Sequence, residues 1–310
     1  MWIILTFRQT TRGKFVRILI TGATGYIGSR LCRLLGDSSE SEMFSLQRSC
    51  HISPVGTTAI EWDLSSPIDE AVLPAKIDAV VHLALARDFR RFPEGVQNLF
   101  AVNVRTTMEL LEYGRKAGAS RFFMASTGNS YAPDFRLDVG ETPAPPNDFY
   151  TASKLAAEVL CRPYQSYFPV NILRAFFPYG PDQDAKTVQR LINCVRAGQP
   201  IFLGRGPNEN GDLLSLIYVD DLVQVIRQAI DEGWNGLFDV AAPEVLSVRH
   251  IANEIGRQLG AQVIFKEGNF TAKEMSADLT GLNEKSRTSL RSFPEGLSAL
   301  LVEEEMGNRT

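Results

Sequence analysis

The chain has 310 residues, of which 44% are hydrophobic and 22% are charged, and its formal net charge is −4. This composition is typical of a globular protein with an ample core, and it argues against binding to nucleic acid or to an anionic membrane surface. No apolar run approaches the roughly 20 residues that span a bilayer. The four cysteines, Cys32, Cys50, Cys161 and Cys194, form no CxxC pair, so we expect no metal site, no disulfide framework and a cytoplasmic location.

The first half of the chain alternates strands with helices. Strands are predicted at 17–20, 43–47, 59–62, 77–84, 121–125 and 170–173, and helices at 27–35, 103–116 and 150–160. This alternation predicts the α/β class and a doubly wound parallel sheet of the Rossmann type. In such a fold, ligands bind beyond the carboxyl ends of the strands.

The second half is less regular, and it predicts a smaller α/β substrate-binding part built from discontinuous C-terminal segments. Helices are predicted at 185–197, 220–230 and 247–259, a polar loop at 204–211 and a strand at 237–240. The acidic run at 303–305 is interpreted as solvated. The predicted dinucleotide-binding domain comprises 16–174 and 216–242, the predicted substrate-binding domain comprises 175–215 and 243–310, and residues 1–15 are interpreted as a disordered or extension segment.

A glycine-rich turn joins the first predicted strand to the first predicted helix. Gly22, Gly25 and Gly28 have the spacing GxxGxxG. A strand, a turn and a helix in this order direct free backbone N–H groups and a helix N-terminus at an anion. Glycines permit the tight turn and the close approach of a phosphate. The alternative is an ordinary βα turn, and the strand–turn–helix context favours phosphate binding.

A tyrosine and a lysine on a later predicted helix suit acid–base chemistry. Tyr150 and Lys154 are four residues apart, so they project from the same helical face. A neighbouring ammonium favours the phenolate, which lowers a tyrosine pKa from its usual value of about 10 and suits general acid–base catalysis. Such a pair is often structural, but here it follows Ser126 and Thr127, two hydroxyl residues at a predicted strand end.

These motifs, in this order, resemble those of the extended short-chain dehydrogenase/reductases of the NAD-dependent epimerase/dehydratase family. The resemblance covers about residues 16 to 240. It rests on TGATGYIG at 21–28, HLALA at 82–86, YTASK at 150–154, LR with YGP within 173–181, and VDD at 219–221.

The resemblance implies an enzyme and a role for each motif. Tyr150 would be the general acid/base, Lys154 would bind the nicotinamide ribose, and Thr127, or less readily Ser126, would bind the reacting oxygen; capping or turn duty is the alternative for both hydroxyls. The implied cofactor-binding residues are Gly22, Ala23, Thr24, Gly25, Tyr26, Ile27, Gly28, Gln47, Arg48, Asp63, Leu64, Leu83, Ala84, Leu85, Asn103, Tyr150 and Lys154. The implied substrate-binding residues are Thr127, Asn129, Phe177 and Arg205.

Departures from the family pattern refine the expected activity. Gln47 and Arg48 stand where an aspartate commonly binds the ribose, which favours NADP over NAD. Gly128 and Asn129 replace the Asp-Glu pair of dehydratases, which disfavours dehydration.

Two further departures concern the substrate. Relatives carry an Asn that contacts a nucleotide-sugar phosphate, and Phe177 stands at that position here. They also carry an Arg with the same role, and Leu214 or Ser215 stands there.

The resulting hypothesis is an NAD(P)-dependent epimerase or reductase that interconverts a secondary alcohol and a ketone on a sugar or nucleotide sugar. Hydride transfer with a tyrosine acid/base would carry the reaction. The alternatives are an NADP-dependent reductase of a non-sugar carbonyl and a non-catalytic cofactor-sensing protein on the same fold. The resemblance also implies a small-molecule substrate and a homodimer formed through the helices that begin near Asn103 and Tyr150.

Overall fold

In the computed structural model, the described residues are 16–37, 41–50, 53–86, 93–130, 149–183, 186–206 and 210–307. Residues 1–15, which are interpreted from the sequence as a disordered or extension segment, lie outside the described residues. None of the described helices is long and apolar enough to cross a membrane.

A seven-stranded sheet forms the larger part of the protein, with the strand order β11-β6-β5-β4-β1-β2-β3. All of its neighbouring strands are parallel. The strands are β1 (Val16–Thr21), β2 (Ser41–Gln47), β3 (Thr57–Glu61), β4 (Ala79–His82), β5 (Arg121–Thr127), β6 (Val170–Ala175) and β11 (Gly236–Val240). Apolar residues on both faces of β1 and β4 explain their central place, because a parallel sheet is covered on each side.

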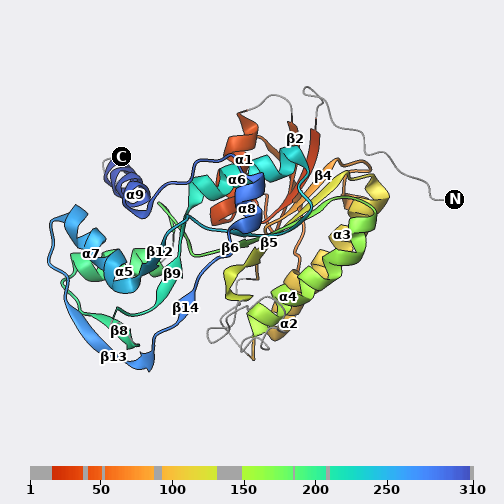
Figure 1. Ribbon diagram of the computed structural model, residues 1–310. Helices are drawn as coiled ribbons and strands as arrows, with labels where there is room; N and C mark the ends of the chain where they lie inside the picture. Colours follow the sequence, from red (N-terminus) through yellow and green to blue (C-terminus); the bar gives the residue numbers. More distant parts are fainter. Residues whose placement is uncertain are drawn as a thin grey trace.

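Helices cover both faces of this sheet (Figure 1). One face packs against α1 (Tyr26–Gly36), α6 (Val219–Glu232) and the short α8 (Thr280–Lys285). The other face packs against α2 (Val96–Phe100), α3 (Thr106–Ala117) and α4 (Phe149–Cys161). This arrangement confirms the predicted doubly wound parallel sheet.

The helix predicted at 103–116 differs from the structure at its start. Helical backbone begins at Val96, and a π-helical turn at Ala101–Arg105 separates α2 from α3. The turn places one extra residue in the helical path around Asn103, a geometry that a pattern of apolar spacing does not reveal. Short 3₁₀ turns lie at Glu70–Val72, Gly128–Ser130 and Arg162–Ser166.

The smaller part of the protein has its own core, at the left of Figure 1. It contains helices α5 (Thr187–Arg196), α7 (Val248–Leu259) and α9 (Phe293–Gly307). Its strands pair in three small sheets: β7 (Pro178–Tyr179) with β10 (Ile217–Tyr218), β8 (Ile201–Arg205) with β13 (Phe265–Thr271), and β9 (Leu213–Ser215) with β12 (Val245–Ser247) and β14 (Glu274–Met275). The segments are discontinuous in sequence, as expected, while the exact domain boundaries stay a prediction.

The interpretation of the acidic run at 303–305 as merely solvated is wrong for two of its residues, Glu303 and Glu304, because each has a side-chain partner. The run lies on α9, and Glu304 forms an ion pair with Arg196 of α5 at 2.7 Å. The run therefore helps to join two helices of the smaller part. This ion pair cannot be predicted from the local sequence, because 108 residues separate Arg196 from Glu304.

Candidate functional site

The glycine turn between β1 and α1 is shaped for a close ligand. Gly22 has a φ of 72°, and a Cβ there would lie 2.7 Å from the backbone nitrogen of Ala84. A Cβ on Gly28 would lie 2.1 Å from the carbonyl oxygen of Gly22. Gly25 caps α1, whose first turn carries no acidic residue. The free N–H groups and positive end of α1 thus form a cradle that fits the pyrophosphate of a dinucleotide.

The segment after β4 lies directly against this turn. The backbone N–H of Leu83 donates to the carbonyl of Thr21 at 3.1 Å, and that of Ala84 donates to the Thr21 hydroxyl at 3.3 Å. Leu85 is partly exposed. The structure therefore brings 83–85 beside the glycine turn, as the sequence predicts, and a cofactor in the cradle would run along it.

His82, at the end of β4, is held by Thr21 at the end of β1. Its Nδ1 lies 2.6 Å from the Thr21 hydroxyl, whereas its Nε2 is buried with no partner among the described residues. Burial, assisted by the charge of Lys154, lowers the pKa of His82 to about 3. His82 is therefore neutral near pH 7.

The ends of β2 and β3 supply the other predicted cofactor residues. Gln47 is buried and its amide donates to the Ser49 carbonyl at 2.8 Å, whereas Arg48 is exposed. Asp63 accepts a hydrogen bond from the backbone of Ser65 at 2.9 Å, and Leu64 is buried. The end of β2 carries no carboxylate, although Glu61 of β3 lies in register with Gln47. Arg48 would offer a cation to a phosphate there.

The tyrosine–lysine pair lies on α4, which packs on the opposite face of the sheet from α1. Lys154 is only 4% exposed, and its ammonium donates to the Ala125 carbonyl at 3.0 Å. Burial lowers the pKa of Lys154 to about 8, although the charge of Glu158 opposes this effect. Tyr150 is partly buried one turn earlier on the same helix.

Asn103 stabilises the start of α4. Its amide donates to the Ser153 hydroxyl at 2.9 Å, and that hydroxyl donates to the Tyr150 carbonyl at 2.7 Å. The Asn103 side-chain oxygen is buried without a partner in the described part of the chain. Asn103, in the π-helical turn, therefore supports the backbone of Tyr150 through the Ser153 hydroxyl.

The two hydroxyl residues at the end of β5 have different surroundings. The Ser126 hydroxyl donates to the Glu158 carboxylate at 2.6 Å, which commits it to a buried network. The Thr127 hydroxyl oxygen accepts a hydrogen bond from the backbone N–H of Asn129 at 3.2 Å, and no contact with Glu158 involves it. The geometry favours Thr127 over Ser126 for binding a reacting oxygen.

The predicted substrate residues lie in two places. Phe177 follows β6 with a φ of 37°, which is rare for an aromatic residue and stores strain at this position. Arg205 lies on β8 and pairs with Glu267 of β13 at 2.5 Å, with both side chains largely exposed. Leu214 is buried in the core of the smaller part, so it offers no phosphate ligand.

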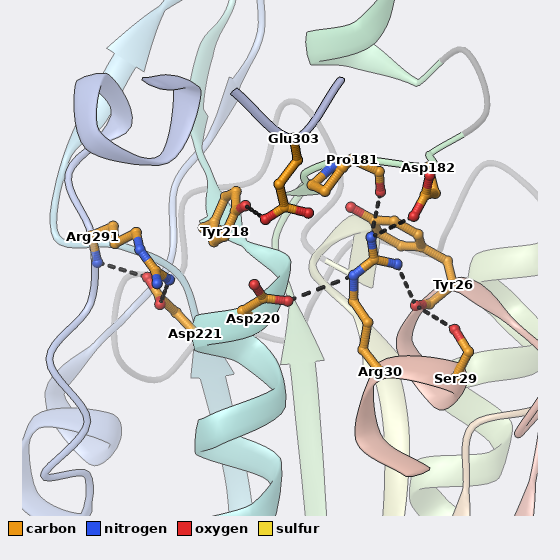
Figure 2. A network of polar contacts seen from close by, with 10 residues as sticks. All are labelled: Tyr26, Ser29, Arg30, Pro181, Asp182, Tyr218, Asp220, Asp221, Arg291 and Glu303. Carbon is orange, nitrogen blue, oxygen red and sulfur yellow. Dashed lines mark hydrogen bonds and ion pairs between the residues drawn. The ribbon is translucent and has the colours of Figure 1, made fainter. Parts of the chain in front are cut away.

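Figure 2 shows a network that the sequence does not predict, centred on Arg30 of α1. Its guanidinium donates to the Pro181 carbonyl at 2.6 Å and to Asp182 at 3.2 Å, and its Nε lies 3.6 Å from Asp220 at the start of α6. It also lies over the ring of Tyr26, 4.7 Å from the centroid. The glycine turn's own helix is thereby joined to the 178–182 segment.

The same network reaches the C-terminal helix. Asp221 pairs with Arg291, and the Tyr218 hydroxyl donates to Glu303 of α9 at 3.4 Å. These partners are separated by 70 and 85 residues, so no local signal could have found them. Glu158 was also missed, although its position four residues after Lys154 was a usable signal.

Comparison with known proteins places this geometry in a family. A profile described as the NAD dependent epimerase/dehydratase family matches residues 18–241. The low-salt glycan biosynthesis protein Agl12 of Haloferax volcanii is 27% identical over 91% of this chain and 96% of its own length. A UDP-glucose 4-epimerase of Mycolicibacterium smegmatis is 27% identical over 79% of this chain and 83% of its own length.

Solved structures agree on the fold. UDP-glucuronic acid 4-epimerase from Bacillus cereus, in complex with UDP-glucuronic acid and NAD, has a TM-score of 0.77 at 24% identity, covering 92% of this chain and 97% of its own. WbmG of Bordetella bronchiseptica, in complex with NAD, has a TM-score of 0.79 at 21% identity, covering 96% of both chains. Since the family profile spans the chain from β1 to the end of β11, the protein belongs to the NAD dependent epimerase/dehydratase family of enzymes.

Proposed function

We propose that the protein is an epimerase that acts on a nucleotide sugar with the aid of a nicotinamide dinucleotide. The observation that carries the proposal is the Tyr150–Lys154 pair on α4, with the Lys154 ammonium held against the end of β5, two residues from Thr127. Curated relatives include a UDP-glucose 4-epimerase and a UDP-glucuronate 4-epimerase, which supports a nucleotide-sugar substrate.

The proposed chemistry assigns each group a separate task. Tyr150 takes the proton of a substrate hydroxyl and later returns one to the carbonyl oxygen. Thr127 donates a hydrogen bond to the same oxygen, and the charge of Lys154 favours the phenolate of Tyr150. A nicotinamide dinucleotide, held in the Gly22–Gly28 cradle and along 83–85, would supply hydride acceptance and return. Epimerisation then requires that the carbonyl presents its other face.

The surroundings of Gly128 support an epimerase over a dehydratase. Dehydration needs a second acid–base pair after Thr127, and the sequence offers Gly128 and Asn129 there. The buried ring of Phe176 fills the space that a side chain at position 128 would need. Position 128 therefore has no room for a carboxylate side chain.

A second candidate, an NADP-dependent reductase of a non-sugar carbonyl, is favoured by one observation. Two polar residues that relatives direct at a phosphate are replaced here by Phe177 and by Leu214 or Ser215, and both Leu214 and Ser215 are buried. Arg48, exposed at the end of β2, supports NADP as the cofactor in either case.

Product analysis separates the two candidates. The purified protein is incubated with UDP-glucose, UDP-glucuronic acid and UDP-N-acetylglucosamine in the presence of NAD or NADP, and with aromatic and alicyclic ketones and NADPH. Epimerised sugar without net cofactor consumption, lost in Tyr150→Phe, supports the proposal. Stoichiometric NADPH oxidation with a ketone and no sugar product would identify the reductase instead.

We also propose a homodimer formed through the helices on the α4 side of the sheet. Phe100, Met108 and Val159 are large apolar side chains that are about half exposed on α2, α3 and α4. A second copy covering them would remove this surface from water.

A further inference from the structure

Three side chains with acid–base chemistry follow one another along α4. Tyr150, Lys154 and Glu158 are separated by four residues each, so they occupy successive turns of one helical face. Lys154 and Glu158 are 4% and 2% exposed. The proposed chemistry assigns roles to Tyr150 and Lys154 and none to Glu158, although Glu158 is a buried carboxylate on the same helical face.

The Glu158 carboxylate is held on both oxygens. Oε1 accepts hydrogen bonds from the Ser126 hydroxyl at 2.6 Å and from Nε of Arg174 at 2.9 Å, and Oε2 accepts one from Nη2 of Arg174 at 2.7 Å. Ser126 lies on β5 and Arg174 on β6, so two neighbouring strands position the carboxylate. Charge-assisted, bidentate contacts of this kind are strong and geometrically specific.

The groups around the Lys154 ammonium are otherwise neutral. The Ala125 carbonyl accepts its hydrogen bond. From β4, His82 is uncharged because burial lowers its pKa to about 3. Further along α4, burial raises the pKa of the Cys161 thiol to about 12. Glu158 is the anion that faces Lys154 among these described residues, and it forms its ion pair with Arg174 of β6, not with Lys154.

We infer that Glu158, fixed by Ser126 and Arg174, is a positioning residue that keeps the Lys154 ammonium charged beside Tyr150. This inference rests on the proposed acid–base role of Tyr150. An ammonium buried against a neutral carbonyl alone tends to lose its proton, and a carboxylate one turn away opposes that loss. Because Arg174 holds the carboxylate, Glu158 stabilises the charge at a distance and leaves the ammonium free for Ala125 and a ligand.

Titration of the Tyr150 phenol tests the inference without any substrate. The near-ultraviolet absorbance of phenolate is followed against pH, and the curve of a matched Tyr150→Phe protein is subtracted so that Tyr150 alone remains. In Glu158→Gln, Lys154 loses its anionic neighbour while the positive charge of Arg174 stays nearby, so Lys154 deprotonates at lower pH. The phenolate then loses its cation, and we expect the Tyr150 titration to move to higher pH by about one unit.

An unchanged titration, or a move to lower pH, would overturn the inference. A move to lower pH is the result expected if Glu158 acted only as a distant negative charge on Tyr150. Asp221→Asn is the matched control, because Asp221 is also a buried carboxylate paired with an arginine, but on α6. This control should lower stability and leave the Tyr150 titration unmoved.

Two further variants protect the test against failure to fold. Glu158→Asp keeps the charge and should restore most of the wild-type titration. The double variant Glu158→Met/Arg174→Met removes both charges together, which a buried site tolerates far better than one unpaired ion. It should show the same move to higher pH as Glu158→Gln. If no nucleotide sugar is turned over but the titration moves, the proposed function fails and the inference stands.

Discussion

The ring of Phe176 lies against Gly128, and a Cβ at that glycine would be 2.7 Å from Cγ of the ring. Phe176 directly follows β6 and is fully buried, so its ring has no space into which to move. The contact joins the turn after Thr127 to the neighbouring strand. The Phe176 ring therefore occupies the space that a side chain at position 128 would fill. A larger residue at 128 would require the ring to move.

Gly128→Ala should be destabilised by about 2 kcal/mol, because overpacking a filled core costs roughly 1–3 kcal/mol. Unfolding in urea measures the change in the free energy of unfolding. Gly36→Ala is the control, since a Cβ at Gly36 meets its nearest atoms at an ordinary 3.6 Å. Equal stability of the two variants would contradict the contact described for Phe176.

Gly22→Ala should lose dinucleotide binding as well as stability. The new Cβ would meet the backbone of Ala84, which distorts the cradle, and alanine is strained at a φ of 72°. Gly118→Ala shares the strain, with a φ of 81°, but its Cβ would meet nothing within 4 Å. Calorimetric titration with NAD and NADP should therefore show binding lost in Gly22→Ala and retained in Gly118→Ala. Retained binding in Gly22→Ala would argue against the cradle.

Arg48→Ala should weaken NADP binding by about ten- to a hundredfold and leave NAD binding unchanged. A charge-assisted contact to the 2′-phosphate contributes roughly 1.5–3 kcal/mol, and the 2′-hydroxyl of NAD offers no such charge. Calorimetric titration at one fixed salt concentration measures both affinities. Arg33→Ala, on α1, serves as the control for loss of one positive charge. If NAD binds more tightly than NADP and Arg48→Ala changes neither affinity, the preference for NADP is wrong.

Charge placed on the apolar helical face should prevent the proposed dimer. Met108→Lys and Val159→Lys each put an ammonium where a second copy would pack, and burying an unpaired charge is costly. Sedimentation velocity should show a dimer for the wild type and a monomer for both variants. Phe202→Lys changes an equally exposed side chain on β8 and should leave the dimer intact. A monomeric wild type would refute the proposal.

His82 should make the protein less stable below pH 6.5. Burial depresses its pKa to about 3, so the unfolded chain binds a proton below its ordinary pKa while the folded protein does not. Stability is then lost as the pH falls from 6.5 towards 3, with a slope of about 1.4 kcal/mol per pH unit. Urea unfolding at several pH values, compared with His82→Gln, isolates this slope. Parallel curves for the two proteins would show that His82 does not titrate in this way.

Local patterns predict the main sheet well, and the reasons are specific. The apolar runs of β1 and β4 and the glycine turn are determined by residues adjacent in sequence. The small strands of the second part were not predicted as strands, because β9 (Leu213–Ser215) and β14 (Glu274–Met275) are too short for any period to show. Their pairing depends on partners about 60 residues away.

In the candidate site, too, some residues are predictable from local motifs and others depend on contacts between distant elements. Tyr150 and Lys154 follow from a motif, whereas the commitment of Ser126 to Glu158 depends on a contact between β5 and α4. The strained backbone of Phe177 has no signature in the local composition, since aromatic residues rarely adopt a positive φ. Contacts between distant elements, and not residue types alone, determine which side chains, such as that of Ser126, are engaged in buried hydrogen bonds.

The place of β11 at one edge of the sheet has a consequence for synthesis on the ribosome. β6 pairs with β11, and the chain builds β7, α5, β8, β9, β10 and α6 between these two strands. Until Val240 has emerged, the outer edge of β6 carries unpaired backbone groups that can recruit another chain. A fragment ending at Ala175 should therefore aggregate, although it holds six of the seven strands of the sheet.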